Sequence, residues 1–303
     1  NGTNAIVTGM YNKLSVNANI FNNLIGNIYA PSSIGPASGA DEVVGIKDSV
    51  NNTGPANWNH NIYNNTVYID GTSSGTNFGT TAIKTYFATT PLFTSLRNNI
   101  FINNSVPKGA GLAVAHRRAG TVNYTTFLTN SNNNIYYAGT PSATNLIFTD
   151  GVTNCQTLAT YKTQVAGRES ASTTENVAFL STSGISPNFL HVNTAFATTA
   201  ESGGLTISSM TDDFDGDIRA GNVGYLGTGT NYDIGADEFG GTINDVAGPS
   251  IISPVVLNSC DNLNRTISGV LITDASGVPT TGGLMPRSEE HTSELQSRFG
   301  ISY

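Results

Sequence analysis

The phrase NIF occurs at residues 19–21 and 99–101, and the phrase NIY occurs at residues 61–63 and 134–136. Further asparagines stand beside each copy, as in NANIFNN, NHNIYNN, RNNIFINN and NNNIYY. The isoleucines of successive copies are separated by 42, 38 and 35 residues. A repeat of drifting length in this range is typical of solenoids and propellers, in which each unit buries a face only against its neighbours.

Short β-branched segments lie between the copies, for example VVGIKDSV at residues 43–50 and TAIKTYFA at residues 81–88. Loops rich in Gly, Ser and Thr separate them, which favours strands over helices. Asparagine tolerates left-handed backbone, and stacked asparagine side chains form ladders. We therefore predict an all-β chain whose residues 1–240 form a right-handed parallel β-helix. The isoleucines expected to stack in one column are Ile20, Ile62, Ile100 and Ile135.

Other repeated or all-β folds fit the sequence less well. A β-sandwich is not built from repeated units, so it does not require a repeated sequence motif. A propeller would carry a Trp-Asp signature, and the only tryptophan is Trp58. The Leu/Asn frame of leucine-rich repeats is absent. A short helix is predicted at residues 157–168, where apolar residues recur at helical spacing.

The most specific stretch is residues 211–239, where DFDGDIR and DIGADEF flank a loop of Gly and Asn. Together with the repeats, it resembles the terminal phrase of right-handed parallel β-helix proteins secreted by Bacteroidota, within the pectate-lyase-like superfamily. The resemblance covers residues 1–239. It implies a β-helix closed by residues 211–239, an extracellular or cell-surface location, and contact with a polysaccharide or cell-surface glycan.

The sequence pattern changes after residue 239, where the acidic phrases end. Residues 241–286 resemble a linker and the first strands of an incomplete immunoglobulin-like module. Residues 287–303 contain RSEEHTSELQS, which resembles a translated sequencing adapter and is excluded from fold reasoning. The rival interpretation of this tail is a charged amphipathic segment. Since the chain begins without Met, we expect an N-terminally truncated, monomeric segment of a larger multidomain protein.

Composition excludes several functional classes. Charged residues make up 11% of the chain and the formal net charge is −8, which argues against nucleic-acid binding. No apolar run reaches the length of a membrane span. The only cysteines, Cys155 and Cys260, lack metal-ligand spacing, and we expect no disulfide between them.

The acidic phrase is the best metal-binding candidate. Asp213, Asp215 and Asp217 alternate around Gly216, and oxygen ligands in this pattern suit a structural Ca²⁺. The alternative is that the motif's carboxylates cap backbone N–H groups and pair with Arg219 where the solenoid ends, because a terminal repeat must hide its edge. The carboxylates in this alternative are those of Asp215, Asp217, Asp233, Asp237 and Glu238. No other cofactor is predicted.

The sequence offers only weak catalytic candidates, His116, Arg117 and Arg118, which follow the strand-like GLAVA. In β-helix polysaccharide lyases, which the chain resembles, an Arg or Lys abstracts the proton α to a uronate carboxyl beside a bound calcium. This segment has no acid nearby in the sequence. The alternative is a solvated edge patch whose Arg stems cover apolar residues.

Several aromatic residues are candidates for stacking on sugar rings, although core packing is the commoner role. We predict an extracellular structural or adhesive segment of a bacterial surface or secreted protein, in contact with carbohydrate. The alternative is a polysaccharide lyase or glycoside hydrolase, which requires carboxylates and Arg or Lys to converge in one groove. A phage-type tail fibre would need an apolar trimer stripe that the sequence lacks. The aromatic candidates are Trp58, Tyr63, Tyr68, Tyr86, Phe87 and Phe93.

Overall fold

The computed structural model describes residues 6–13, 15–36, 40–50, 58–87, 92–120, 124–244, 250–252 and 271–273. The chain divides into two units, Asn1–Ile243 and Asn244–Tyr303. In the second unit, β14 (Ser250–Ile252) pairs with β15 (Leu271–Thr273) in antiparallel orientation. Most of the predicted immunoglobulin-like stretch, Cys260 and the predicted adapter tail lie outside the described residues.

The strands of the first unit form sheets that we call A, B and C. Sheet A contains the parallel strands β1 (Val7–Lys13), β4 (Asp41–Val50), β7 (Gly79–Phe87), β10 (Ala113–Gly120) and β12 (Asn145–Thr149), and ends in the antiparallel β13 (Asn154–Cys155). Sheet B contains β2 (Asn17–Phe21), β5 (Trp58–Tyr63) and β8 (Leu92–Arg97). Sheet C contains β3 (Leu24–Ile25), β6 (Thr66–Ile69), β9 (Ile100–Asn103) and β11 (Ile135–Tyr137).

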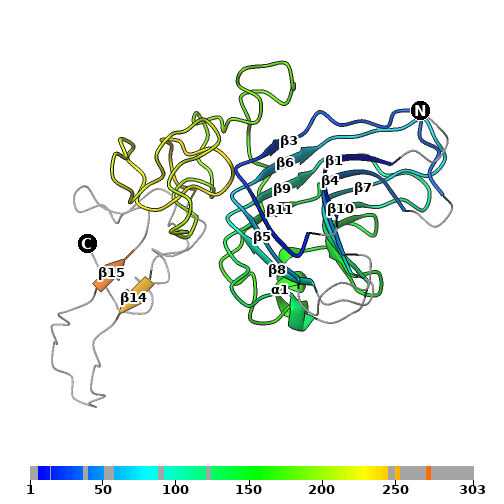
Figure 1. The fold of residues 1–303 in the computed structure, drawn as a ribbon, viewed down its shortest axis with the longest axis horizontal. Coiled ribbons are helices and arrows are strands. Elements are labelled where there is room, and N and C mark those ends of the chain that lie inside the picture. The colour runs from blue at the N-terminus through cyan, green and yellow to red at the C-terminus, as the bar shows by residue number, and fades with distance from the viewer. Residues whose placement is uncertain are drawn as a thin grey trace, which may run out of the picture. The chain divides into compact units, whose positions relative to one another are not determined.

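The chain visits sheets A, B and C in turn and then returns to A, so each circuit is one coil (Figure 1). Strands of successive coils pair in parallel, with Val43 beside Thr80 and Thr80 beside Ala113 in sheet A. The result is a parallel β-solenoid of about three turns. The prediction of an all-β chain with a parallel β-helix is confirmed.

Pairs of asparagines form the corner between sheet B and sheet C. The first residue of each pair has left-handed backbone, with φ of 52° at Asn22, 49° at Asn64, 54° at Asn98 and 56° at Asn133. This conformation costs most L-residues roughly 1–2 kcal/mol, and asparagine adopts it more readily than they do. The tight corner therefore explains why asparagine recurs at this point of each coil.

The second asparagine of each pair points inward and forms a ladder. Asn23 Nδ2 donates to Asn65 Oδ1 at 2.8 Å, Asn65 Nδ2 to Asn99 Oδ1 at 3.0 Å, and Asn99 Nδ2 to Asn134 Oδ1 at 2.9 Å. The ladder ends at Glu169, whose Oε2 accepts from Asn134 Nδ2 at 2.9 Å. The true repeat steps are 42, 34 and 35 residues.

The prediction of a single isoleucine column is wrong. Ile20 pairs with Ile62 in sheet B, and Ile62 pairs with Leu96. Ile100 pairs with Ile135 in sheet C. Both sides of the corner need an apolar residue beside asparagine, so the Asn-Ile-aromatic phrase occurs before the corner in two coils and after it in two others.

Sheet C is buried on both faces. Phe101 and Tyr136 point into the solenoid core, whereas Ile100, Ile102 and Ile135 belong to a separate apolar cluster. That cluster is completed by residues 174–243, which we call the lateral segment because they run beside strands β3, β6, β9 and β11 (Figure 1). Each aliphatic side chain buried in this way contributes roughly 1.5–3 kcal/mol.

The corner asparagines also hold the lateral segment by hydrogen bonds. The first asparagine of each pair has its side chain turned outward by the left-handed backbone, and its side-chain amide donates to backbone carbonyls of that segment. The bonds run from Asn22 to Asp212 at 2.9 Å, from Asn64 to Asp233 at 3.4 Å and Gly235 at 3.3 Å, from Asn98 to Leu205 at 2.7 Å, and from Asn133 to Gly203 at 2.8 Å.

The predicted short helix is confirmed as α1 (Leu158–Gln164). Thr157 caps its first turn, and Tyr161 and Val165 pack into the core. The preceding Cys155 is a buried free thiol. Among the described residues, no helix is long and apolar enough to cross a membrane.

Candidate functional site

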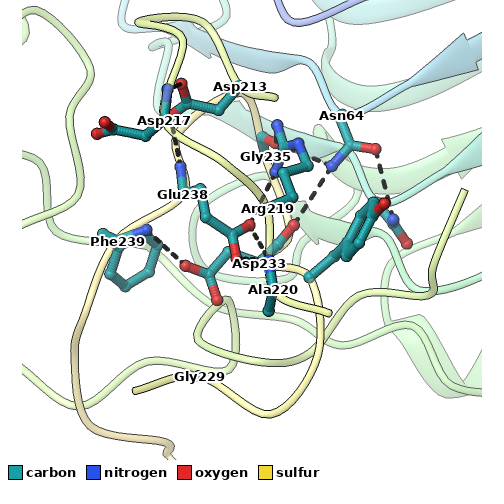
Figure 2. Close-up of polar contacts among 12 residues, drawn as sticks. Asn64, Asp213, Asp217, Arg219, Ala220, Gly229, Asp233, Gly235, Glu238 and Phe239 are labelled. Atoms are coloured by element: carbon teal, nitrogen blue, oxygen red, sulfur yellow. Dashed lines mark hydrogen bonds and ion pairs between the residues drawn. The ribbon is translucent and has the colours of Figure 1, made fainter. Parts of the chain in front are cut away.

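Asp213 organises the start of the acidic closing motif, residues 211–239 (Figure 2). Its Oδ1 accepts the N–H groups of Asp215 at 2.9 Å and Asp217 at 2.8 Å, and its Oδ2 accepts the N–H of Glu238 at 2.8 Å. The carboxylate thus closes the turn at residues 213–217 and ties it to the second acidic phrase. Asp213, which the capping alternative did not name, is thus a backbone-capping residue, whereas Asp215 and Asp217, which it did name, are exposed.

Arg219 is fully buried and joins the motif to the solenoid (Figure 2). Its Nη1 lies 3.1 Å from Glu238 Oε2, and its Nη2 donates to Asn22 Oδ1 at 3.0 Å and to the Gly235 carbonyl at 3.1 Å. Its Nε donates to the Asp212 carbonyl at 3.1 Å. A buried guanidinium needs such partners, because its charge is costly to remove from water.

Glu238 and Asp233 complete this buried network. Glu238 accepts the N–H groups of Ala220 and Asp233 at 2.8 and 2.9 Å. Asp233 accepts those of Ser202 at 2.6 Å and Phe239 at 2.7 Å. Burial and the nearby Glu238 raise the pKa of Asp233 to about 9. The acidic motif therefore works chiefly as a set of backbone clamps.

The clamps do not lie where the sequence placed them. We expected them at the end of the solenoid, but Arg219 bonds to Asn22 at the first corner and Asn64 bonds to Gly235 at the second. The motif thus packs along the side of the coils. The apolar outer face of sheet C needs covering as much as the last coil does, which the sequence repeat could not reveal.

The predicted calcium ligands are separated in the structure. Asp213 is committed to backbone N–H groups, and Asp217 is exposed. Asp215 lies instead near His191 and Asp237. Calcium binding by Asp213, Asp215 and Asp217 stays a prediction.

The weak catalytic candidates of β10 have separate environments. His116 lies inside the coils, in register with Ile83 and Phe148, and its Nδ1 is 2.8 Å from Tyr161 Oη. Burial, helped by the charge of Arg118, lowers the pKa of His116 to about 3. A neutral imidazole enclosed by aromatic rings cannot serve as a base for an external substrate.

Arg118 is also buried, with Nη2 bonded to Thr126 Oγ1 and the guanidinium above the Phe127 ring at 5.8 Å. Burial lowers its pKa to about 10. The interpretation of His116 and Arg118 as a solvated edge patch is therefore wrong. His116 is in register with Ile83 and, one coil earlier, with Ile46. Arg118 is in register with Thr85 and Asp48, which are also buried, so both residues occupy inward-facing positions.

Arg117 points to the outer side of sheet A and does have an acid beside it. Its Nη2 lies 3.0 Å from Asp41 Oδ1, and Lys84 Nζ lies 2.8 Å from Asp41 Oδ2. Thr81 Oγ1 donates to the same carboxylate at 2.8 Å. The expectation of bases without acids is wrong, because Asp41 is two coils away along the stack and far away in sequence.

The outer face of sheet B was only partly identified from the sequence. Ile20, Ile62 and Leu96 point into the core, so the residues on either side of them point outward. These outward residues are amides, aromatics, one cation and the hydroxyl of Ser95, which is buried. In columns across the strands they are Asn17, Asn59 and Phe93; Asn19, Asn61 and Ser95; and Phe21, Tyr63 and Arg97.

The other aromatic candidates have mixed positions. Trp58 is buried, and Tyr68 packs edge-on against Phe179 at 5.8 Å. Tyr86 is partly buried, and the side chain of Phe87 lies outside the described residues. Only Tyr63 and Phe93 of the predicted set fall on the outer face of sheet B.

Two buried polar groups were missed by the sequence reasoning. His60 Nδ1 lies 2.8 Å from Asp48, and its Nε2 lies 2.7 Å from the Ser15 carbonyl, so it links neighbouring coils. Glu169 ends the asparagine ladder, and burial raises its pKa to about 7. His60 stands beside the NIY phrase and is recognisable only once the coils are aligned.

Comparison with known proteins identified no similar protein. No protein-family model matches the chain, and the searches of curated proteins and of solved structures found no match. The fold therefore defines the class on its own, as a parallel β-solenoid.

Proposed function

We propose that this chain is an extracellular structural segment of a large bacterial surface or secreted protein, and that its sheet B contacts carbohydrate. The amide and aromatic outer face of sheet B carries the proposal. Amide side chains both donate and accept hydrogen bonds, as sugar hydroxyls require. Aromatic rings offer apolar faces to the C–H surface of a sugar ring.

The face is held in place before any ligand binds. Tyr63 Oη donates to Asn61 Oδ1 at 2.9 Å and contacts Ser95 Oγ at 3.2 Å, and Arg97 lies 5.6 Å from the Tyr63 ring centroid. Asn61 Nδ2 donates to Asn19 Oδ1 at 2.9 Å. Such preorganisation favours affinity, because fewer side chains must be ordered on binding.

The test is titration of the full chain with a panel of neutral and acidic polysaccharides. Phe21→Ala and Tyr63→Ala are expected to weaken binding about tenfold, which corresponds to about 1.4 kcal/mol. Tyr11→Ala is the matched control, because Tyr11 is similarly exposed but belongs to sheet A. Binding that is equally weakened by Tyr11→Ala, or absent across the panel, would contradict the proposal.

Polysaccharide cleavage is the second candidate function, and the convergence of Asp41, Lys84 and Arg117 on sheet A favours it. The two cations suit recognition of a uronate carboxylate, and an Arg or Lys is the type of base that abstracts the adjacent proton in a lyase. The same panel tests this candidate through the ultraviolet absorbance of unsaturated products. Activity that is lost in Arg117→Ala would support a lyase, and absence of unsaturated product from every polysaccharide would contradict this second candidate function.

A further inference from the structure

His191, Asp215 and Asp237 form a cluster in the lateral segment that the acidic-motif reasoning did not assemble. One candidate ligand atom from each residue lies within 4.8 Å of the other two. His191 belongs to the loop before the closing motif, and the two aspartates come from its two acidic phrases. The fold, rather than sequence spacing, brings these side chains together.

The short distances within the cluster are longer than good hydrogen bonds, and they involve different nitrogens of the His191 ring. His191 Nε2 lies 3.4 Å from Asp215 Oδ2, and His191 Nδ1 lies 3.5 Å from Asp237 Oδ1. N–H···O hydrogen bonds are usually about 2.7–3.2 Å. Two ligands bound tetrahedrally to Zn²⁺ at about 2.0–2.2 Å are separated by about 3.3–3.6 Å, so the three ligand atoms, now within 4.8 Å of one another, must close by a small movement to share one ion.

Asp237 is the most buried member of the cluster. Its side chain is 10% exposed, and its Oδ2 accepts the Val192 N–H at 2.8 Å. Its Oδ1 is aimed at the His191 ring, beyond hydrogen-bond length. A cation at this point would offset the charges of two neighbouring carboxylates.

We propose that His191, Asp215 and Asp237 bind a first-row divalent cation of the Zn²⁺ type, with water as the remaining ligand. Imidazole together with carboxylates favours such a cation over Ca²⁺, which prefers all-oxygen coordination. One ring nitrogen binds the ion, so the His191 ring and the Asp215 side chain turn towards Asp237. Their exposed fractions of 21% and 43% leave room for that movement.

The cation would act as a staple on the lateral segment. It would fasten the loop at His191 to the turn at residues 213–217 and to Asp237 near the end of the motif. This role differs from the calcium prediction in its ligands, because Asp213 and Asp217 take no part. It is also independent of the carbohydrate contact proposed for sheet B.

The experiment is calorimetric titration of the chelator-treated full chain with Zn²⁺ alone, followed by Co²⁺ as a spectroscopic probe. We expect one site, a higher melting temperature with Zn²⁺, and a visible Co²⁺ band typical of nitrogen and oxygen ligands. His191→Ala and Asp215→Asn are expected to weaken binding by about tenfold or more. Asp217→Asn is the matched control and is expected to bind like the wild type.

Each other outcome overturns the proposal. Zn²⁺ binding that persists in both His191→Ala and Asp215→Asn would place the ion elsewhere. Binding lost equally in Asp217→Asn would indicate an acidic turn without a role for the imidazole. Absence of saturable Zn²⁺ binding to the folded wild-type chain would refute the site outright. Asp215 is partly exposed, so its variant is expected to fold and keeps the test decisive.

Discussion

Asn99 offers the sharpest test of how the coils are held together. It is fully buried, and its Oδ1 accepts the Asn65 N–H at 3.1 Å and Asn65 Nδ2 at 3.0 Å. Its Nδ2 donates to the Ile62 carbonyl at 2.8 Å and to Asn134 Oδ1 at 2.9 Å. The substitution Asn99→Ala removes all of these contacts from the middle of the ladder.

The cost follows from the partners that remain. The backbone N–H of Asn65 and the carbonyl of Ile62 both lose the side-chain partner at a buried corner. A buried polar group left without a partner costs about 1–3 kcal/mol, so the pair predicts a loss of about 2–6 kcal/mol. That loss is a large share of the roughly 5–15 kcal/mol by which a domain is stable.

The assay is urea denaturation followed by far-ultraviolet circular dichroism. Asn99→Ala is expected to lower the midpoint with little change in slope, since the surface exposed on unfolding stays nearly the same. Asn61→Ala is the matched control: this asparagine also bonds to the neighbouring coil but is only half-buried, so its loss is expected to stay near 0.5 kcal/mol. Equal midpoints for the two variants would refute the ladder argument.

Three further predictions concern buried charges. Burial lowers the pKa of His60, but the hydrogen bond to Asp48 and the charge of Asp48 outweigh burial and raise this pKa above 6.5. The stability that the pair contributes is complete below pH 6.5 and is lost as pH rises through the raised pKa, and pH-dependent denaturation of His60→Gln should lack that loss. Burial raises the pKa of Glu169 from 4.5 to about 7, so stability should fall as pH rises across that interval, and a Glu169→Gln slope equal to wild type would contradict this. Arg219→Met strands the buried Glu238 carboxylate and should cost about 3–5 kcal/mol in urea denaturation, much of it recovered by adding Glu238→Gln.

The solenoid was predictable because its corners repeat in the sequence, but the register was not. Ile62 and Ile100 occupy identical phrases, yet one precedes the asparagine corner and the other follows it. Both environments require an apolar residue next to asparagine. The feature that fixes the register is the left-handed backbone at Asn64 and Asn98. A pair of adjacent asparagines indicates this corner, but the pairs are recognisable only when the coils are aligned.

The candidate sites were less predictable, since they depend on contacts between distant coils. Asp41 and Arg117 form an ion pair although they stand far apart in the chain. His116 reads as a polar surface residue until its register partner Ile83 shows that the column faces the core. The lateral segment has no repeat at all, so no sequence pattern could bring His191 to Asp215.

Because the corner asparagines bond to fixed positions of the lateral segment, that segment sets the spacing between the corners of the solenoid. Its carbonyls at Gly203 and Leu205 meet the last two corners, and that at Asp212 meets the first. Duplicating the 34 residues between Asn65 and Asn99 would lengthen the amide ladder without harm to the rungs themselves. It would, however, move the later corners away from their carbonyls. Whole coils added ahead of the first corner would leave these bonds in place, so the stack is more readily lengthened at that end than between its corners.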